Sequence, residues 1–351
     1  MEYVTLLLCF ISAVLLTPIV KKLAFKIGAT DKPDPRKVHQ KIMPRLGGLA
    51  IYISTLIGFA VLQPESPYLI PILIGSFIII VTGVADDILQ LSPKVKLFGQ
   101  VLAAAVVIYG GVEVQFINLP FNTQLNLGIF GIPLTMLWII GITNAINLID
   151  GLDGLAAGVS SIVLMTVSVM AIINGNEFVF AMGCILLGST LGFLIFNFHP
   201  AKIFMGDTGA LFLGFMISVT SLLGFKNITL FSLVVPVIML GVPISDTFFA
   251  IIRRFVNKKP LSAPDKSHLH HCLLRLGFSH QKTVLIIYAM SAIFGAAAML
   301  FSMTTLWGSV FIITVLLFLI ELTVEMIGLV DANYRPMLKF IRRISNVKKA
   351  S

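Results

Sequence analysis

The sequence predicts an all-α protein, a polytopic integral membrane helix bundle with about eleven transmembrane helices. Hydrophobic residues make up 57% of the 351 residues and charged residues only 12%, which is unlike soluble globular proteins. Apolar runs of about the 20 residues needed to cross a bilayer recur along the whole chain. Charged residues gather between alternate runs. No large soluble segment fits between them, so residues 1–351 are interpreted as a single membrane domain.

The first run lacks the basic leader and the small-residue cleavage site of a signal peptide, and a basic stretch follows it. It is therefore interpreted as a retained span. The apolar runs lie at residues 3–20, 46–63, 68–84, 96–112, 132–149, 154–174, 178–196, 209–224, 230–252, 283–303 and 308–328. The segment at 113–131 carries Gly, Asn and Thr but almost no charge, which argues against chemistry on that side.

If each of these runs crosses the membrane once, the charged residues divide unequally between its two sides. Every Lys and Arg except Lys226, every Asp and every His then falls on one side. The positive-inside rule makes this side cytoplasmic, with the amino terminus outside and the carboxyl terminus inside. The net charge of +9 follows from the same rule and from anionic lipids, so membrane lipids rather than nucleic acid are expected as partners.

Asp86 and Asp87 close the third run, in GVADDILQLSPKVKLFGQ. Adjacent carboxylates near lipid repel each other unless a cation or several donors neutralise them. Magnesium on a phosphate substrate would do so, and Lys96 follows within reach of the same surface. A solvated helix end is the alternative for the acidic pair, and a membrane-surface anchor is the alternative for the neighbouring Lys94.

The fifth run ends in TNAINLIDGLDGLAAG, which places Asn144, Asn147, Asp150 and Asp153 three residues apart. This spacing keeps neighbours on one side of a helix. Oxygen ligands in this number suit a hard divalent cation, whereas zinc or iron would favour His and Cys. A hydrogen-bonded turn between two spans is the alternative.

The eighth run opens with a short glycine-flanked motif in NFHPAKIFMGDTGALFLG. A helix amino terminus offers free N–H groups to phosphate, and Asp207 can bind a metal that bridges it. The alternative is that Asp207 or Thr208 simply caps the helix. Phe204, three residues earlier, can stack on a nucleobase or pack against lipid.

The longest cytoplasmic segment, 253–282, brings His268, His270 and His271 together. Neutral rings can bind zinc, and ring N–H groups can hold phosphate. A solvated loop against lipid headgroups is the alternative. Asp246 lies before Arg253 and Arg254, and an ion pair along one helix face is the favoured interpretation.

With these motifs in chain order, the sequence resembles the polyprenyl-phosphate N-acetylhexosamine-1-phosphate transferases over essentially its whole length. The likeness is carried by DKPDPRKVHQKIMPRLGG, ADD with KLFGQ, NAINLIDGLDG, NFHPAKIFMGDTG and DKSHLHHCLLRLGF. It is greatest for the branch that begins wall teichoic acid and related envelope polymers from UDP-N-acetylglucosamine. The muramyl-pentapeptide branch has three consecutive histidines and a TPTMGG-like segment, whereas this chain has HLHH and MPRLGG.

The resemblance implies that undecaprenyl phosphate attacks the β-phosphorus of the UDP-sugar and releases UMP, at the inner face of a bacterial cell membrane. It implies Mg²⁺, with Mn²⁺ as a substitute, held by Asp207 and Asp87. Asp86 and Asp87 would flank the reaction centre, and Lys96 would hold phosphate. One of the two aspartates would either deprotonate the lipid phosphate, which is the favoured hypothesis, or attack as a nucleophile. Lys41 and Arg45 would bind the lipid phosphate. The nucleotide pocket would consist of Asn147, Asp150, Asp153, Asn197 and Phe204, and its two aspartates would also take part in catalysis. The diphosphate and the sugar would be enclosed by His268, His270 and His271.

Two alternatives accompany this hypothesis. The donor is UDP-N-acetylmuramoyl-pentapeptide in the related branch, and a secondary transporter is the rival from another class. Transporters place ionisable groups near the bilayer midplane in repeated halves, whereas these acids lie at helix ends and no repeat is visible. A homodimer is the expected assembly.

Overall fold

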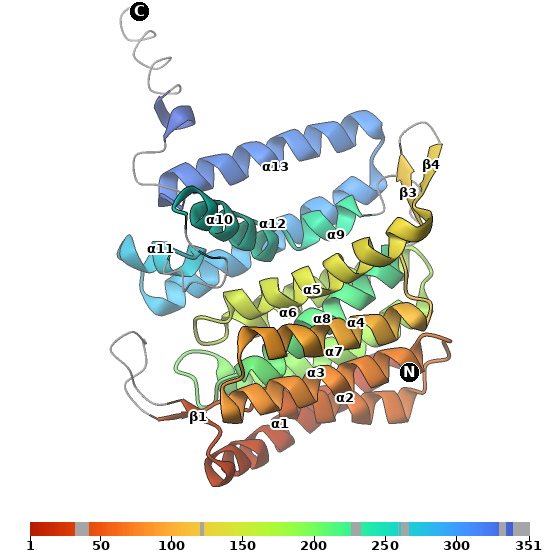
Figure 1. Cartoon of the computed structure of the whole chain (residues 1–351), viewed down its shortest axis with the longest axis vertical. Helices are drawn as coiled ribbons and strands as arrows, with labels where there is room; N and C mark the ends of the chain where they lie inside the picture. Colours follow the sequence, from red (N-terminus) through yellow and green to blue (C-terminus); the bar gives the residue numbers. More distant parts are fainter. Residues whose placement is uncertain are drawn as a thin grey trace, which may run out of the picture.

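The computed structural model describes residues 1–31, 42–119, 123–225, 233–258, 260, 267–329 and 335–339. It is a bundle of helices with two short hairpins (Figure 1). The helices are α1 (Glu2–Ile27), α2 (Gly48–Leu62), α3 (Leu69–Leu89), α4 (Pro93–Tyr109), α5 (Gly131–Ile149), α6 (Leu155–Ile173), α7 (Glu177–Asn197), α8 (Gly206–Phe225), α9 (Val234–Met239), α10 (Gly241–Val256), α11 (Leu269–Arg275), α12 (His280–Met303) and α13 (Leu306–Ile327). Strand β1 (Thr30–Asp31) pairs with β2 (Met43–Pro44), and β3 (Phe116–Leu119) with β4 (Thr123–Asn126), both antiparallel.

Among the described residues, eight helices are long and apolar enough to cross a membrane, and the shorter α2 is also apolar. The prediction of an all-α polytopic membrane protein is therefore confirmed in class. Helix α8 lies at the centre of the bundle, where it packs against α2, α3, α5 and α6. Almost all of its residues are buried, including the polar Thr208, Ser218 and Thr220, as expected for a helix that other helices surround.

The predicted ninth run differs from the structure, which divides it into α9 and α10 around Leu240. Pro243 has no N–H to donate to the preceding turn, and Gly241 weakens the helix at the same place. Within the segment expected to be a loop, α11 forms a further short helix.

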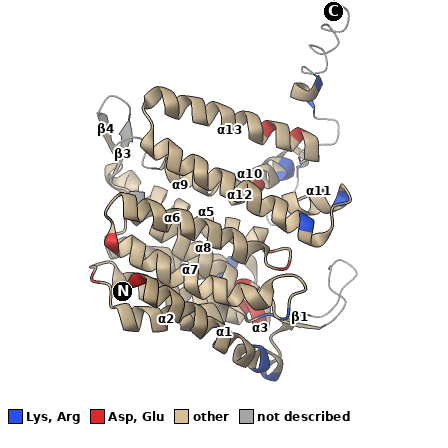
Figure 2. Cartoon of the chain, turned by 180° about the vertical axis from the view of Figure 1, so that it is seen from behind, with Lys and Arg blue, Asp and Glu red and all other residues tan. Residues whose placement is uncertain are grey.

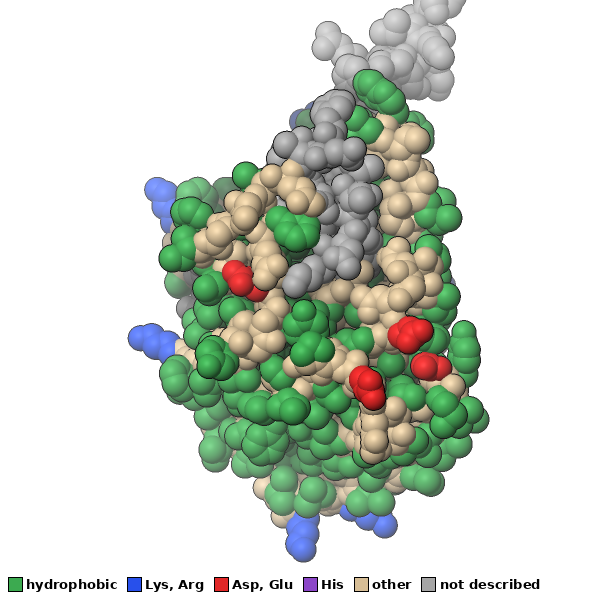
Figure 3. All heavy atoms as spheres, turned by 90° about the vertical axis from the view of Figure 1, so that its right-hand side faces the viewer, with side chains coloured by type: hydrophobic (Ala, Val, Ile, Leu, Met, Phe, Trp, Pro, Cys, Tyr) green, Lys and Arg blue, Asp and Glu red, His purple; other side chains and the backbone are tan. Residues whose placement is uncertain are grey.

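The two ends of the bundle differ in chemistry. The Lys and Arg side chains gather toward the end that carries β1, α11 and the last turn of α1 (Figure 2). The opposite end, seen in Figure 3, shows many hydrophobic side chains together with a few Asp or Glu side chains. We therefore expect the candidate site at the basic end of the molecule.

Candidate active site at the basic end of the bundle

The segment after β2 runs beside the segment before α8. The Phe204 N–H donates to Pro44 O at 2.8 Å, and the Gly47 N–H donates to Phe204 O at 3.0 Å. Arg45 and Phe204 form a parallel bridge within this pairing. The pairing places Arg45 next to the first turn of α8, 162 residues away along the chain.

Glycines allow the start of α8 to approach its neighbours closely. A Cβ on Gly48 of α2 would collide with the backbone of Gly209, and one on Gly83 of α3 would collide with Thr208. Gly206 has a φ of +72°, and a Cβ there would collide with the Asp87 carboxylate. These contacts fix the amino terminus of α8 against the ends of α2 and α3.

Asp87 caps α8 from the neighbouring helix. Its Oδ1 accepts the Asp207 N–H at 3.0 Å, and its Oδ2 accepts the Thr208 N–H at 3.0 Å and the Thr208 hydroxyl at 2.6 Å. Arg45 Nε lies 3.0 Å from the same Oδ1, and the Asp87 side chain is fully buried. Four donors, of which Arg45 is positively charged, therefore satisfy the Asp87 carboxylate. This carboxylate joins α3 to α8.

Asp86, Asp207 and Lys96 form the second part of the cluster. Lys96 Nζ lies 3.2 Å from Asp86 Oδ2 and 2.5 Å from Asp207 Oδ2. Arg45 reaches the other Asp207 oxygen at 3.2 Å. The three aspartates and two cations leave a formal charge of −1, which a divalent cation bound to phosphate can balance.

The predicted metal residues Asp207 and Asp87 lie side by side in this cluster, but they differ in what surrounds them. The Asp207 carboxylate is paired with Lys96 and Arg45 and keeps some exposure to solvent. Asp87 is buried and accepts backbone donors as well. Carboxylate oxygens are the ligands that Mg²⁺ prefers, so the donor set fits the ion, with Asp207 as the more accessible ligand.

The α5–α6 turn holds the next group of predicted residues. The Gly154 N–H donates to Asn197 Oδ1 at 3.1 Å, and Asn197 Nδ2 donates to Ile203 O at 3.0 Å. Asn197 therefore joins this turn to the segment that carries Phe204, which is half-buried. Asn147 is half-buried in the last turn of α5, while Asn144 pairs with Gln100 instead of facing the turn.

Asp150, at the end of α5, has a strongly perturbed acidity. Burial is the largest cause that raises its pKa, which reaches about 7; the negative charges of Asp207 and Asp87 add to the rise, and the positive charge of Arg45 opposes it. A carboxyl group with this pKa can hold or release a proton near neutral pH. This links Asp150 electrostatically to the Asp86–Asp87–Asp207 cluster.

We expect that the free energy of unfolding falls less steeply with rising pH when Asp150 is replaced by Asn. Folded Asp150 keeps its proton up to a pH of about 7, whereas the unfolded chain loses it near the ordinary value of 3.8. The folded state therefore binds more protons between these values, and stability falls as pH rises through this window. The amide cannot ionise, so the variant should lose less stability between pH ~5 and pH ~8, by about 2–3 kcal/mol.

Melting temperatures in detergent, measured across that pH range, check this prediction. The exposed Glu177→Gln substitution at the start of α7 is the matched control and should follow the wild type. Parallel curves for wild type and Asp150→Asn would show that Asp150 does not titrate differently on folding.

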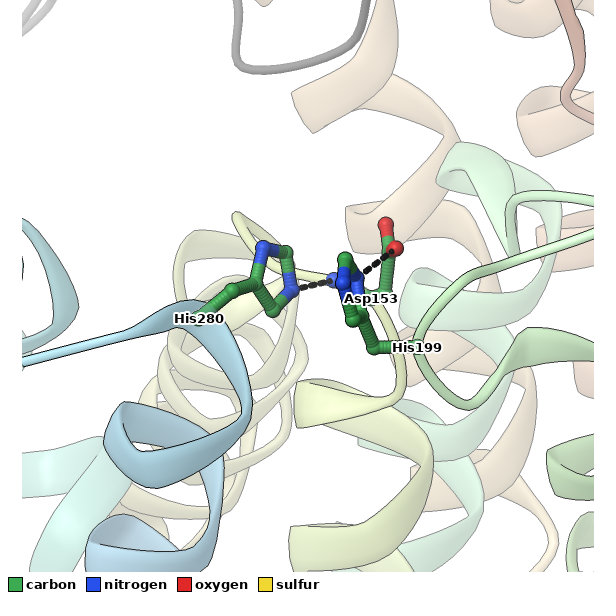
Figure 4. A group of neighbouring side chains, drawn as sticks. All are labelled: Asp153, His199 and His280. Atoms are coloured by element: carbon green, nitrogen blue, oxygen red, sulfur yellow. Dashed lines mark hydrogen bonds and ion pairs between the residues drawn. The ribbon is translucent and has the colours of Figure 1, made fainter.

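Asp153 makes a second network with His199 and His280 (Figure 4). Asp153 Oδ2 lies 2.8 Å from His199 Nδ1 and accepts the Ala201 N–H at 3.1 Å, while the Asp153 N–H donates to His280 Nε2 at 3.0 Å. Two histidines and a carboxylate this close can hold a transition metal. The two rings, however, stack at 4.2 Å, and one nitrogen of each ring is already hydrogen-bonded to Asp153, so the three residues hold the α5–α6 turn in place by hydrogen bonds.

The histidine segment contacts the same turn. A Cβ on Gly151 would collide with the His270 ring, so that imidazole lies against the turn between Asp150 and Leu152. Burial and the neighbouring His271 lower the pKa of His270 to about 3. His270 is therefore neutral at physiological pH and can donate or accept one hydrogen bond without adding charge. His268 and His271 flank it, with His271 at a ring distance of 4.2 Å.

The structure thus brings Arg45, Asp86, Asp87, Lys96 and Asp207 into one cluster. It places Asp150, Asp153, Asn197 and Phe204 around the adjoining turn and loop, where His270 also lies. Lys41 lies outside the described residues. Sequence reasoning missed His199, His280 and Tyr288, whose hydroxyl donates to Gly154 O at 2.5 Å, because their partners are far away along the chain.

A helical membrane bundle whose basic end joins carboxylates, Lys and Arg at a helix amino terminus defines a class: enzymes that act on phosphate groups at a membrane surface. Comparison with known proteins agrees. Residues 69–225 match glycosyl transferase family 4. The chain is 51% identical to a probable undecaprenyl-phosphate N-acetylglucosaminyl 1-phosphate transferase of Bacillus subtilis, over 97% of this chain and 96% of that protein.

Two further relatives extend the comparison. A decaprenyl-phosphate N-acetylglucosaminephosphotransferase of Mycolicibacterium smegmatis is 36% identical over 80% of this chain and 78% of its own length. A phospho-N-acetylmuramoyl-pentapeptide-transferase of a Thermoanaerobacter species is 34% identical over 83% and 94%. The chain belongs to glycosyl transferase family 4 and is a membrane transferase, as the sequence motifs predicted.

Proposed function

We propose that the protein transfers N-acetylglucosamine 1-phosphate from UDP-N-acetylglucosamine to undecaprenyl phosphate. The observation that carries this proposal is the convergence of Asp86, Asp207, Lys96 and Arg45 beside the amino terminus of α8. The 51% identity to a relative named for this donor sugar and lipid supports the choice of substrates.

In the proposed reaction, an oxygen of the lipid phosphate forms a bond to the β-phosphorus of the UDP-sugar. The bond between that phosphorus and the bridging oxygen breaks, so UMP leaves and the sugar stays on a lipid diphosphate. Phosphoryl transfer needs alignment and charge neutralisation more than covalent help from the protein. Mg²⁺, for which Mn²⁺ would substitute, would supply positive charge at the transferring phosphate when held by Asp207.

The residues of the chain divide this work. Lys96 and Arg45 hold phosphate oxygens, with Lys41 assigned to the lipid phosphate alongside Arg45. Because Asp87 is already engaged by four donors, we assign the general base to Asp86, which would take the proton of a monoprotonated lipid phosphate. Asp87 would then fix the first turn of α8 and so position Asp207. Its negative charge would also contribute to binding the metal.

The adjoining turn forms the proposed nucleotide pocket. Asn147, Asp153 and Asn197 line it, Asp150 supports proton balance, and Phe204 stacks on uracil. His268, His270 and His271 close on the diphosphate and the sugar.

We place this site on the cytoplasmic side of a bacterial cell membrane, in a chain that crosses the bilayer eleven times with its amino terminus outside. The concentration of Lys and Arg at the site end supports this orientation through the positive-inside rule (Figure 2). The likeness to the teichoic acid branch supports a role at the first membrane step of such an envelope polymer, and we expect a homodimer.

Release of UMP from two donors tests the proposal. Purified protein in detergent receives undecaprenyl phosphate, Mg²⁺ and either UDP-N-acetylglucosamine or UDP-N-acetylmuramoyl-pentapeptide. We expect UMP only with the first donor, and none when the lipid phosphate is omitted or the metal is chelated. No release with either donor would refute the transferase, and release with the second alone would assign the chain to the other branch.

A further inference from the structure

A buried aspartate outside the carboxylate cluster holds the histidine segment. Asp246 lies in α10, and His268 lies immediately before α11. Asp246 Oδ2 is 2.9 Å from His268 Nδ1, and Asp246 Oδ1 accepts the Leu269 N–H at 2.8 Å. Asp246 is 1% exposed and His268 5%. Both carboxylate oxygens therefore serve the one junction, instead of the ion pair with Arg253 or Arg254 that the sequence favoured.

We propose that Asp246 is a positioning residue for the transferase, acting through His268; this inference rests on the proposed function. A carboxylate accepts hydrogen bonds and cannot donate them, so it fixes the proton of His268 on Nδ1. In a neutral ring, Nε2 is then the atom left to accept a hydrogen bond from a substrate O–H. Asp246 also caps α11, because its Oδ1 accepts the N–H of Leu269, the first residue of that helix. The side chain of the N-cap residue His268 makes no capping hydrogen bond.

The surroundings of Asp246 strengthen this hold. Asp246 and Leu269 lie in the wall of a cavity of about 130 Å³ between α10, α12 and α13, whose other walls are mostly apolar, including Phe249, Met290 and Phe294. Few polar groups there compete for the carboxylate. A charge-assisted hydrogen bond in such a setting is stronger than one exposed to water.

Contacts continue from His268 to the candidate active site. The His268 and His270 rings are nearly parallel, with centroids 6.0 Å apart and an angle of 4°. His270 in turn lies against Gly151, beside Asp150. A shift at Asp246 would therefore displace the ring that touches the turn of the proposed nucleotide pocket.

A double-mutant cycle tests the proposal. Asp246→Asn keeps one acceptor oxygen but loses the charge and the second acceptor, and His268→Asn keeps an N–H near the position of Nδ1. We expect Asp246→Asn to lower kcat for UMP release by about 10- to 100-fold, by analogy with the carboxylates that orient metal-binding histidines, with a smaller change in KM. In the His268→Asn background the same substitution should change kcat by less than about threefold.

The controls separate this role from a structural one and from failure of the proposed function. Ser245→Ala, in the wall of the same cavity, should keep wild-type kcat. If Asp246→Asn does not fold, Asp246→Glu, which keeps both acceptor oxygens but moves them by one methylene, replaces it in the cycle and should lower kcat by about 10- to 100-fold at an unchanged melting temperature. Wild-type kcat in either single variant, or full additivity in the cycle, would overturn the inference. If the wild type itself releases no UMP, the proposed function fails instead.

Discussion

Replacement of Asp207 by Asn is expected to abolish UMP release while the protein stays folded. The amide keeps the shape of the side chain but loses the negative charge that faces Lys96 and Arg45 and, in our proposal, the metal. Loss of one preorganised electrostatic group in an active site typically costs about 10²- to 10³-fold in kcat, and a metal ligand lies at the upper end. UMP release at saturating Mg²⁺ and donor measures the effect.

The matched control is Glu177→Gln, which replaces an exposed carboxylate with an amide in the first turn of α7, far from the site. This variant should retain wild-type activity. Melting temperature and elution volume establish that Asp207→Asn is folded. Activity within twofold of the wild type in a folded Asp207→Asn variant would remove Asp207 from the proposed metal site.

Asp87→Asn should combine lost activity with lost stability, because this carboxylate is part of the packing between α3 and α8. The amide cannot accept bonds from all four donors, and one of them, Arg45, is charged. Breaking a buried ion pair typically costs about 3–5 kcal/mol. We therefore expect a clearly lower melting temperature together with at least a 100-fold loss of UMP release.

Asp86→Asn is the control for this prediction, since the neighbouring carboxylate has Lys96 as its charged partner and makes no backbone cap on α8. It should lose activity with much less loss of stability. Equal melting temperatures for the Asp87→Asn and Asp86→Asn variants would mean that the cap on α8 does not carry the stability assigned to it.

The long apolar runs were predictable because a membrane helix must satisfy all its backbone groups within itself, which leaves a strong local signal. The helix class followed from them. The division between α9 and α10 was not predicted, although Gly241 and Pro243 mark it in the sequence. An apolar run of suitable length outweighed these two local breaks.

The candidate site was predicted as a set of residues but not as an arrangement. Motifs at the ends of alternate runs indicated that Asp86, Asp150 and Asp207 would share one face. The cap from Asp87 onto Thr208 depends on glycine contacts between helices, which no single motif reveals. The pairing of Asp246 with His268 joins residues 22 positions apart across a loop, and local spacing favoured the arginines about two turns further along α10.

The cap on α8 also bears on how the enzyme matures in the membrane. Arg45, Asp86, Asp87 and Lys96 are synthesised well before the Asp207 and Thr208 N–H groups that complete their surroundings. Until α8 inserts, the early helices hold charges without their final partners, which is costly in a medium of low polarity. Insertion of α8 therefore completes the carboxylate cluster, and the histidine segment at α11 follows later, so we expect that a chain ending before α8, which lacks Asp207, does not consume a UDP-sugar.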